Sequence, residues 1–293
     1  MTKVIMHGCN GKMGQMITNI IAAEEDIEIV AGVDASDHIR NTYPVFAGIA
    51  QCNVAADVVI DFCAAAAVDA LLDYCVEKQI PCVLCTTGLS EAQNAHVTEA
   101  SKKVAVLKSA NMSLGVNMLL KLLKSAAQVL VPAGFDIEIV EKHHNLKVDA
   151  PSGTALALAD TINEEFDNSY EYVYDRSQKR EKRTDKEIGI SAVRGGTIVG
   201  DHDIIFAGED EVITLSHRAY SKALFAKGAV QAAKFLKGKP AGKYDMKDVI
   251  GEVLYGVSAM YRHSQRTGKT DCRLFPCGQK RQCNGEFCRG KGC

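Results

Sequence analysis

The sequence predicts an α/β protein built on a doubly wound parallel sheet, with a second, α+β part in the same chain. Two observations lead to this prediction. Up to about residue 113, short apolar runs alternate with helical stretches, which is the pattern of a parallel sheet with helices on both faces. Beyond residue 131, strand-like runs follow one another with few helices between them, which indicates a mixed or antiparallel sheet.

The expected elements follow in chain order. The first part has strands at 3–8, 27–34, 56–63, 80–87 and 104–110, and helices at 14–25, 64–78 and 90–102. The second part has a helix at 114–131, strands at 135–141, 188–196, 200–208 and 211–219, a helix that begins after Ser152, and a last helix at 221–238. The polar, charged stretch 168–186 is expected to be an exposed excursion, and its run "KREKR" a solvated face.

Composition excludes several kinds of partner. The chain has 293 residues and a net charge of -2, so neither a nucleic acid nor an anionic membrane surface is expected as a partner. No apolar run approaches the ~18 residues that a membrane span needs. The chain passes from Met1 directly into a strand-like run, which leaves no room for a signal peptide and predicts a cytoplasmic location.

Six of the eleven cysteines lie in the first 85 residues, on apolar segments, and are expected to be small buried side chains. Cys82 and Cys85 form a C-x-x-C pattern in an apolar strand-like run. Strand alternation would point these two side chains to opposite faces, which argues against a redox or metal role.

The segment Gly8–Gly14, "GCNGKMG", stands between an expected strand and an expected helix. Glycines there let the backbone approach a pyrophosphate, and the helix N-terminus offers free N–H groups. Asp34 ends the next strand, where an acid would bind the ribose hydroxyls of a dinucleotide. Together these features predict dinucleotide binding; the alternative is a phosphate-free turn with a surface aspartate.

The stretch 141–155, "EKHHNLKVDAPSGTA", places His143, His144 and Lys147 on a loop that leaves a strand. Ser152 is the expected N-cap of the following helix, so the N–H groups of Gly153 and Thr154 would face an anion. Imidazoles, an ammonium group and a helix N-terminus suit a small, multiply negative substrate. Reduction of its double bond consumes a proton, so one of these side chains is expected to be a general acid.

The stretch 138–155, "EIVEKHHNLKVDAPSGTA", resembles the signature of the dihydrodipicolinate reductase family, which serves the diaminopimelate route to lysine. The resemblance extends through "GCNGKMG", "CTTGLS", "SANMSLGVN", "VRGGTIVGDHDIIFAG" and "KYDMKDVIG", and covers about residues 1–251. It implies 4-hydroxy-tetrahydrodipicolinate reductase activity, in which hydride passes from NADH or NADPH to a cyclic imine dicarboxylate.

The resemblance also implies an architecture and a set of site residues. The architecture is a Rossmann-type sheet domain at 1–113, completed by 220–251, with an inserted α+β substrate-binding and tetramerisation domain at 114–219. By the same resemblance His143 is the acid/base histidine, Lys147 donates the proton, and His144, Gly153 and Thr154 hold the substrate carboxylates; no metal site is implied. The implied cofactor-binding residues are Gly8, Cys9, Asn10, Gly11, Lys12, Met13, Asp34, Cys85, Thr86, Thr87, Ser109, Ala110, Asn111 and Met112.

Two departures from the family pattern are Cys85, where glycine is common, and Met112, where phenylalanine is common. Two other functions stay open. A semialdehyde dehydrogenase of similar build would need a nucleophilic cysteine beside a histidine, and no cysteine lies between Cys85 and Cys272. A non-enzymatic nicotinamide-binding sensor would have no reason to keep the histidines and lysine of the 141–155 stretch.

Three further expectations concern the tail, the cofactor and the assembly. Residues 252–293 carry five cysteines with gaps of 5, 6, 5 and 5, which fit no C-x-x-C zinc knuckle; the tail is expected to be disordered and functionless, with a zinc site as the alternative. No arginine stands just after Asp34, where it would meet a 2′-phosphate, so NADH is expected to be preferred to, or used as well as, NADPH. "DIIFAG" is apolar on both faces, which with the family precedent predicts a homotetramer.

Overall fold

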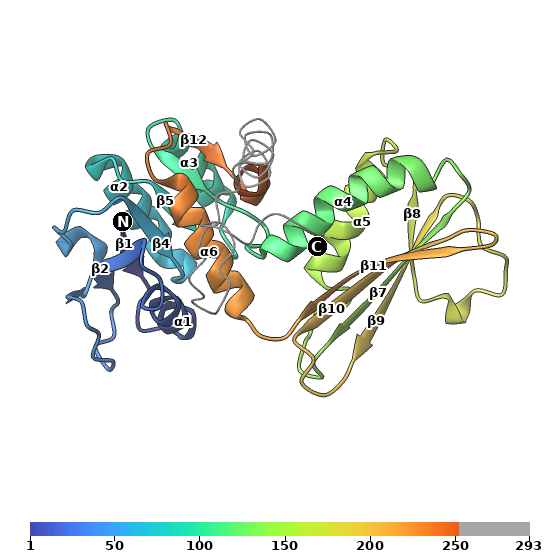
Figure 1. The fold of residues 1–293 in the computed structure, drawn as a ribbon, viewed down its shortest axis with the longest axis horizontal. Helices are drawn as coiled ribbons and strands as arrows, with labels where there is room; N and C mark the ends of the chain where they lie inside the picture. The colour runs from blue at the N-terminus through green and yellow to red at the C-terminus, as the bar shows by residue number, and fades with distance from the viewer. Residues whose placement is uncertain (252–293) are drawn as a thin grey trace, which may run out of the picture. The chain divides into compact units, whose positions relative to one another are not determined.

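The structure, a computed structural model, describes residues 1–251 and contains two sheets (Figure 1). The first has seven parallel strands in the order β12-β6-β5-β4-β1-β2-β3. Its strands are β1 (Thr2–His7), β2 (Ile27–Val33), β3 (Val45–Phe46), β4 (Val58–Asp61), β5 (Cys82–Leu84), β6 (Ala105–Leu107) and β12 (Gly242–Tyr244). The strand order reverses between β1 and β4, and ligands of such sheets bind at the carboxyl ends of the strands at this reversal.

Helices cover both faces of this sheet, as a doubly wound fold requires. On one face α1 (Lys12–Ile21) and α6 (Ala223–Leu236) bury a core that includes Met6, Ile60 and Val230. On the other face α2 (Val68–Lys78) and α3 (Glu91–Ser101) bury a second core around Ile5 and Leu84. Neighbouring residues of each strand therefore point into different cores, because side chains alternate along a strand.

The second sheet has five strands in the order β11-β10-β7-β9-β8. These are β7 (Asp136–His143), β8 (Glu171–Tyr174), β9 (Glu187–Arg194), β10 (Gly200–Ala207) and β11 (Val212–Ala219). The sheet is mixed: β10 pairs antiparallel with β7 and β11, whereas β9 pairs parallel with β7 and β8. The helices α4 (Leu114–Leu130) and α5 (Gly153–Glu164) pack on one face (Figure 1). They bury Ile139, Ile204 and Phe206.

The predicted fold class is confirmed, but the sequence did not predict the short strands β3, β8 and β12 or a last helical segment. Strand β12 and the helical segment that begins at Met246 follow the last expected helix, and β12 extends the parallel sheet beside β6. Short 3₁₀ turns also occur at Ile49–Gln51, Ala65–Ala67 and Arg176–Gln178. The division into domains at 1–113, 114–219 and 220–251 stays a prediction.

The stretch 168–186 is not wholly exposed, contrary to expectation. It contains β8, and Arg183 from the charge run packs against the end of the sheet. Its Nε lies 2.9 Å from Asp136, Nη1 contacts Glu138, and Nη2 donates to the carbonyl oxygens of Ile137 and Glu187 at 3.1 and 2.6 Å. The sequence did not predict this packing. The residues of a charged run are the same whether all of them face solvent or one of them, here Arg183, binds acceptors of the folded sheet.

The cysteines of the first 85 residues are all free thiols, and four of the six are buried. Cys82 lies in the core beneath α2 and α3, whereas Cys85 packs against the core beneath α1 and α6. This confirms that the C-x-x-C pair points to opposite faces. The cysteine-rich tail lies outside the described residues, and within residues 1–251 no helix is both long enough and apolar enough to span a membrane.

Candidate active site

The glycine loop that follows β1 is shaped by close backbone contacts. Gly8 has φ +82°, and a Cβ there would lie 2.7 Å from the carbonyl oxygen of Phe62. A Cβ on Gly14 would lie 2.2 Å from the carbonyl oxygen of Gly8, so only glycine permits this packing of helix on loop. No side chain caps α1 at Gly11, so the first N–H groups of the helix remain available to an anion.

Asp34 lies just past the end of β2 and fixes the loop on either side of it. Its Oδ2 accepts a hydrogen bond from the backbone N–H of Asn10, and its Oδ1 accepts one from that of Ser36, both at 2.9 Å. Each oxygen keeps a further lone pair for a ribose hydroxyl. A cavity of about 500 Å³ opens here, lined by Gly8, Gly11, Asp34, Ala35, Phe62 and Cys63 among others.

An amide network that the sequence reading missed supports this cavity. Asn41 Nδ2 donates to Asn10 Oδ1 at 2.8 Å, and Gln15 Nε2 donates to Asn41 Oδ1 and to the carbonyl oxygen of Cys9, both at 2.9 Å. These bonds tie the segment after Asp34 to the glycine loop. The arrangement fits a dinucleotide: a loop only glycines can form, a helix N-terminus and a carboxylate face one cavity.

A buried polar cluster at the carboxyl ends of β1, β4 and β5 was also missed. Asp61 is fully buried; its Oδ1 lies 2.7 Å from Nδ1 of His7, and its Oδ2 accepts from Thr86 Oγ1 at 2.6 Å. Thr86 Oγ1 also lies 2.9 Å from the carbonyl oxygen of Cys63. The cluster therefore fixes Thr86, one of the residues predicted to contact the nicotinamide.

The donor atoms of His7, Asp61 and Cys63 lie within 4.8 Å of one another, as a metal site would require. The hydrogen bonds to Asp61 already use both of its oxygens. Burial is the main cause that raises the pKa of the Cys63 thiol to about 12, and the Asp61 charge adds to it. A protonated thiol beside a hydrogen-bonded carboxylate is better suited to orienting Thr86 than to binding a cation.

The segment 109–112, also predicted to contact the nicotinamide, is held by the start of α4. Asn111 Oδ1 accepts from the backbone N–H of Ser113 at 2.8 Å, and Asn117 Nδ2 donates to the carbonyl oxygen of Asn111 at 2.7 Å. Met112 is buried against α6, where a Cβ on Gly228 would lie 1.7 Å from its carbonyl oxygen. Cys85 is half-buried and Thr87 exposed, and burial raises the pKa of the Cys85 thiol.

The three candidate side chains at the end of β7 and on the loop after it differ in their surroundings. His143 ends β7, is buried, and places Nδ1 2.6 Å from Glu141 Oε2. His144 is half-buried, and its Nδ1 is a buried atom without a partner among the described residues, a place that water or a ligand normally fills. Lys147 donates to both carboxylate oxygens of Asp149, at 2.6 and 2.8 Å.

The N-terminus of α5 lies beside this group. Ser152 caps the helix as expected, because its Oγ accepts from the backbone N–H of Ala155 at 3.1 Å. Gly153 is exposed and Thr154 half-buried. The hydrogen bond from Lys147 is the main cause that lowers the pKa of Asp149, and the backbone N–H of Gly153 adds to it. The carboxylate of Asp149 thus contacts Lys147, the predicted proton donor, and the N–H of Gly153, which is predicted to hold a substrate carboxylate.

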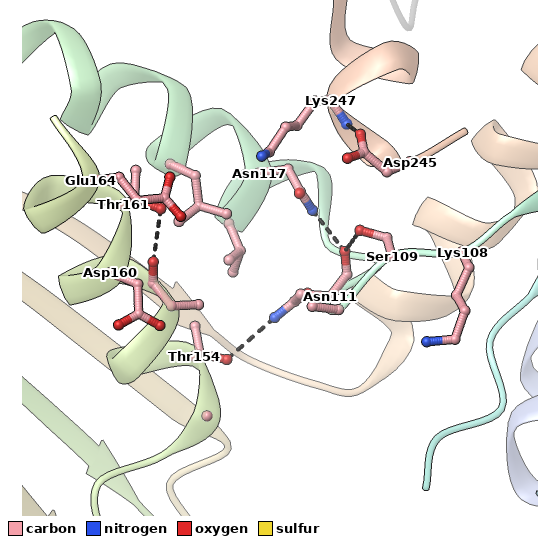
Figure 2. A pocket seen from close by; sticks show the side chains of 15 residues that line it. Lys108, Ser109, Asn111, Asn117, Thr154, Asp160, Thr161, Glu164, Asp245 and Lys247 are labelled. Carbon is pink, nitrogen blue, oxygen red and sulfur yellow. Dashed lines mark hydrogen bonds between the residues drawn. The ribbon is translucent and has the colours of Figure 1, made fainter. Parts of the chain in front are cut away.

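The predicted residues are divided between two cavities. Gly8, Gly11 and Asp34 line the first. A second cavity of about 290 Å³ is lined by Ser109–Asn111 and by Gly153 and Thr154, together with Lys108, Asp160 and Lys247 (Figure 2). None of His143, His144 and Lys147 is among the described residues that line either cavity. The structure therefore joins the predicted nicotinamide segment to the helix N-terminus, and leaves the two histidines and the lysine outside both cavities.

Comparisons with known proteins agree with this geometry. The family descriptions "Dihydrodipicolinate reductase, N-terminus" and "Dihydrodipicolinate reductase, C-terminus" match residues 2–112 and 115–250. A 4-hydroxy-tetrahydrodipicolinate reductase of Caldanaerobacter subterraneus subsp. tengcongensis is 52% identical over 254 residues, which cover 85% of this chain and 98% of that protein. One of Clostridium tetani is 51% identical over 246 residues, covering 84% and 96%.

A solved structure gives the same result. The dipicolinate-bound dihydrodipicolinate reductase from Paenisporosarcina sp. TG-14 superimposes with a TM-score of 0.72 at 26% identity, over 85% of this chain and 99% of that one. The matched segments include the glycine loop, the stretch from Glu141 to Thr154 and both sheets. The chain belongs to the dihydrodipicolinate reductase family.

Proposed function

We propose that this chain is a 4-hydroxy-tetrahydrodipicolinate reductase, which adds hydride and a proton across a double bond of a cyclic imine dicarboxylate to give tetrahydrodipicolinate. The observation that carries the proposal is that the chain contains two preformed sites, one for a dinucleotide and one for a small anion. A dinucleotide cavity lies at the strand reversal of the parallel sheet, and two histidines, a lysine and a helix N-terminus meet at one end of the mixed sheet.

Each group has a task in this reaction. A bound nicotinamide dinucleotide supplies the hydride. Lys147 and the N–H groups of Gly153 and Thr154 neutralise and orient the substrate carboxylates, with His144 alongside. His143 and Lys147 handle the proton. Since hydride and proton come from different parts of the chain, and His143 and Lys147 lie outside both cavities, we expect these parts to close over bound substrate before transfer.

The two other functions considered are disfavoured by this site. A semialdehyde dehydrogenase needs an activated thiolate. Within residues 1–251 the thiols that are not fully buried are those of Cys63 and Cys85, and the pKa values of both are raised. A sensor would not need a buried histidine hydrogen-bonded to a carboxylate.

The test is a turnover assay of the purified chain with the product of dihydrodipicolinate synthase and either dinucleotide. We expect oxidation of NAD(P)H that depends on that product, with kcat on the order of 1–10³ s⁻¹. Dinucleotide binding without any turnover would instead favour the sensor. Turnover of a semialdehyde, and not of the synthase product, would favour the dehydrogenase.

The cofactor is a nicotinamide dinucleotide, and we propose that NADH is used at least as well as NADPH. Ala35, Ser36 and Asp37 follow Asp34, and the carboxylates of Asp34 and Asp37 repel a 2′-phosphate; Lys12 offsets part of this. Ala35→Arg is expected to raise the affinity for 2′,5′-ADP about tenfold relative to 5′-AMP, a change of ~1.4 kcal/mol, measured by calorimetry. Ala35→Gln is the uncharged control. A tenfold preference of the unmodified chain for NADPH would contradict the proposal.

We also propose that the chain forms a homotetramer in the cytoplasm through the outer face of its mixed sheet. Opposite α4 and α5 this face presents Val140, Val193, Ile205 and Val212, of which Val193 and Val212 are 45% and 61% exposed. A sheet face with this much apolar surface is normally covered. Light scattering is expected to give four times the chain mass of 31.6 kDa, and Ile205→Lys is expected to dissociate the assembly. A monomer at micromolar concentration would contradict it.

A further inference from the structure

Glu141 is a fully buried carboxylate at the end of β7, two residues before His143 and on the same face of the strand. Its Oε2 lies 2.6 Å from His143 Nδ1 and accepts from Arg194 Nη1 at 2.8 Å. Its Oε1 accepts from Arg194 Nη2 at 2.7 Å and from the backbone N–H of Ser152 at 3.0 Å. Each carboxylate oxygen of Glu141 therefore has two hydrogen-bond partners.

The carboxylate is kept ionised by these partners. Burial is the largest influence on Glu141 and acts to raise its pKa, but the hydrogen bonds from Arg194, His143 and the Ser152 N–H outweigh burial, and the net shift of the pKa is downward. A buried charge persists only when it is paired and hydrogen-bonded in this way.

Arg194 connects this carboxylate to the substrate side of the molecule. Besides its two bonds to Glu141, its Nη2 donates to the carbonyl oxygen of Asp149 at 2.7 Å. The pair thus joins β7, β9 and the segment that leads into α5. The helix N-terminus bearing Gly153 and Thr154 is consequently held at a fixed distance from His143.

Glu141 also determines which nitrogen of His143 can exchange a proton. An ionised carboxylate only accepts hydrogen bonds, so Nδ1 of His143 must carry a proton and Nε2 is left for the substrate. Nε2 lies against Gly200, where a Cβ would be 3.0 Å away. The His202 ring stands edge-on at 5.2 Å; burial is the main cause that lowers its pKa to about 4, so at neutral pH it adds no competing positive charge.

We propose that Glu141, clamped by Arg194, is a positioning residue of the reductase: it sets the tautomer and orientation of His143 and the distance from His143 to the N-terminus of α5. The proposal rests on the function proposed above. Glu141 itself transfers no proton: it stays ionised and holds the Nδ1 proton of His143, so that Nε2 can take up a proton and pass it to the substrate.

The test compares Glu141→Gln with Glu138→Gln. Glu138 lies on the same strand with its side chain on the opposite face, and it is also paired with an arginine, Arg183. The control therefore removes an arginine-paired carboxylate, 32% exposed where Glu141 is fully buried, without touching His143. Three measurements are made on each full-length variant: ¹⁵N shifts of the His143 ring, the affinity for dipicolinate and for NADH, and the split of turnover into kcat and KM.

In the unmodified chain the ¹⁵N shifts are expected to show a proton on Nδ1. Glu141→Gln is expected to give a mixture of tautomers and a kcat lower by about 10²-fold or more, as loss of an orienting group does elsewhere, whereas both affinities stay within about threefold. Glu141→Asp, which restores the charge, is expected to recover the Nδ1 tautomer and part of kcat. Glu138→Gln is expected to leave the tautomer and kcat unchanged.

Several results would overturn the proposal. One is a proton on Nε2 rather than Nδ1 in the unmodified chain, a measurement that needs no variant to fold. Another is an unchanged tautomer and kcat in Glu141→Gln. A third is an equal loss of kcat in both Gln variants, which would reduce the pair to a structural role. If the unmodified chain lacks reductase activity but Glu141→Gln still changes the His143 tautomer, the proposed function fails while the carboxylate's control of His143 stands.

Discussion

Asn111 Nδ2 donates a hydrogen bond to Thr154 Oγ1 at 3.3 Å (Figure 2). This bond joins the segment after β6 in the parallel sheet to the N-terminus of the helix that packs on the mixed sheet. Each residue was assigned from the sequence to a different ligand, Asn111 to the nicotinamide and Thr154 to the substrate. Their contact places the two proposed binding regions side by side.

Substitution of Thr154 tests the substrate end of this contact. Thr154→Val removes the hydroxyl but keeps the shape, so the affinity for dipicolinate is expected to fall about 10- to 100-fold, the value of one hydrogen bond to a charged group, ~1.5–3 kcal/mol. Thr154→Ser keeps the hydroxyl and is expected to stay within about threefold of the unmodified chain. Calorimetric titration measures both, and equal losses in the two variants would contradict the assignment.

The proposed acid–base roles predict a particular division of kinetic effects. His143→Ala and Lys147→Ala are each expected to lower kcat by ~10²–10⁴, with NADH affinity almost unchanged, because neither side chain is proposed to contact the dinucleotide. His144→Ala is expected to raise KM more than it lowers kcat. Steady-state kinetics and NADH fluorescence titration measure these effects, and His96→Ala on α3 is the control. Near-normal turnover in His143→Ala, or lost NADH binding in Lys147→Ala, would show the roles to be wrong.

The ion pair between Lys147 and Asp149 competes with the substrate. Lys147 must release Asp149, whose carboxylate is 58% exposed, before it can bind a substrate carboxylate. An exposed pair contributes about 0.2–1 kcal/mol, so Asp149→Asn is expected to tighten dipicolinate binding by about 1.5- to 5-fold. Asp73→Asn removes the same charge from α2 and should have no effect. Weaker dipicolinate binding in Asp149→Asn would indicate that Asp149 helps to form the site.

Buried His202 predicts a loss of stability in weak acid. Burial chiefly, and then the neighbouring His143, lower its pKa from the usual 6.5 to about 4, with Glu141 acting in the opposite direction. As the pH falls from about 6.5 to about 4, His202 binds a proton in the unfolded chain but not in the folded chain, so the free energy of unfolding decreases. The decrease is roughly 3 kcal/mol over the whole window.

Denaturant titrations at about pH 7.5 and pH 5 measure this loss, and His202→Asn is expected to show a smaller decrease than the unmodified chain. The exposed His38→Asn is the control and should behave like the unmodified chain. An acid-induced loss of equal size in His202→Asn would assign the effect to other groups.

Much of this protein follows from its sequence alone, because the patterns concerned are local. The alternation of apolar runs and helices predicted the parallel sheet, and side-chain alternation predicted that Cys82 and Cys85 lie in different cores. The glycine loop could also be predicted from the sequence. At Gly14 the backbone lies so close to the carbonyl oxygen of Gly8 that only glycine fits there. Ser152 was recognisable as an N-cap from its place before the helix.

Only the tertiary structure decided the contacts between residues distant in the chain. Asp61 and Thr86 are 25 positions apart, and Glu141 and Arg194 are 53 apart; no local pattern marks them as partners. Glu141 did carry one signal, since it precedes His143 by two residues on a strand and so shares its face. Whether a carboxylate there is a surface charge or a buried anchor depends on whether an arginine from a parallel neighbouring strand reaches it, and strand pairing is a property of the assembled sheet.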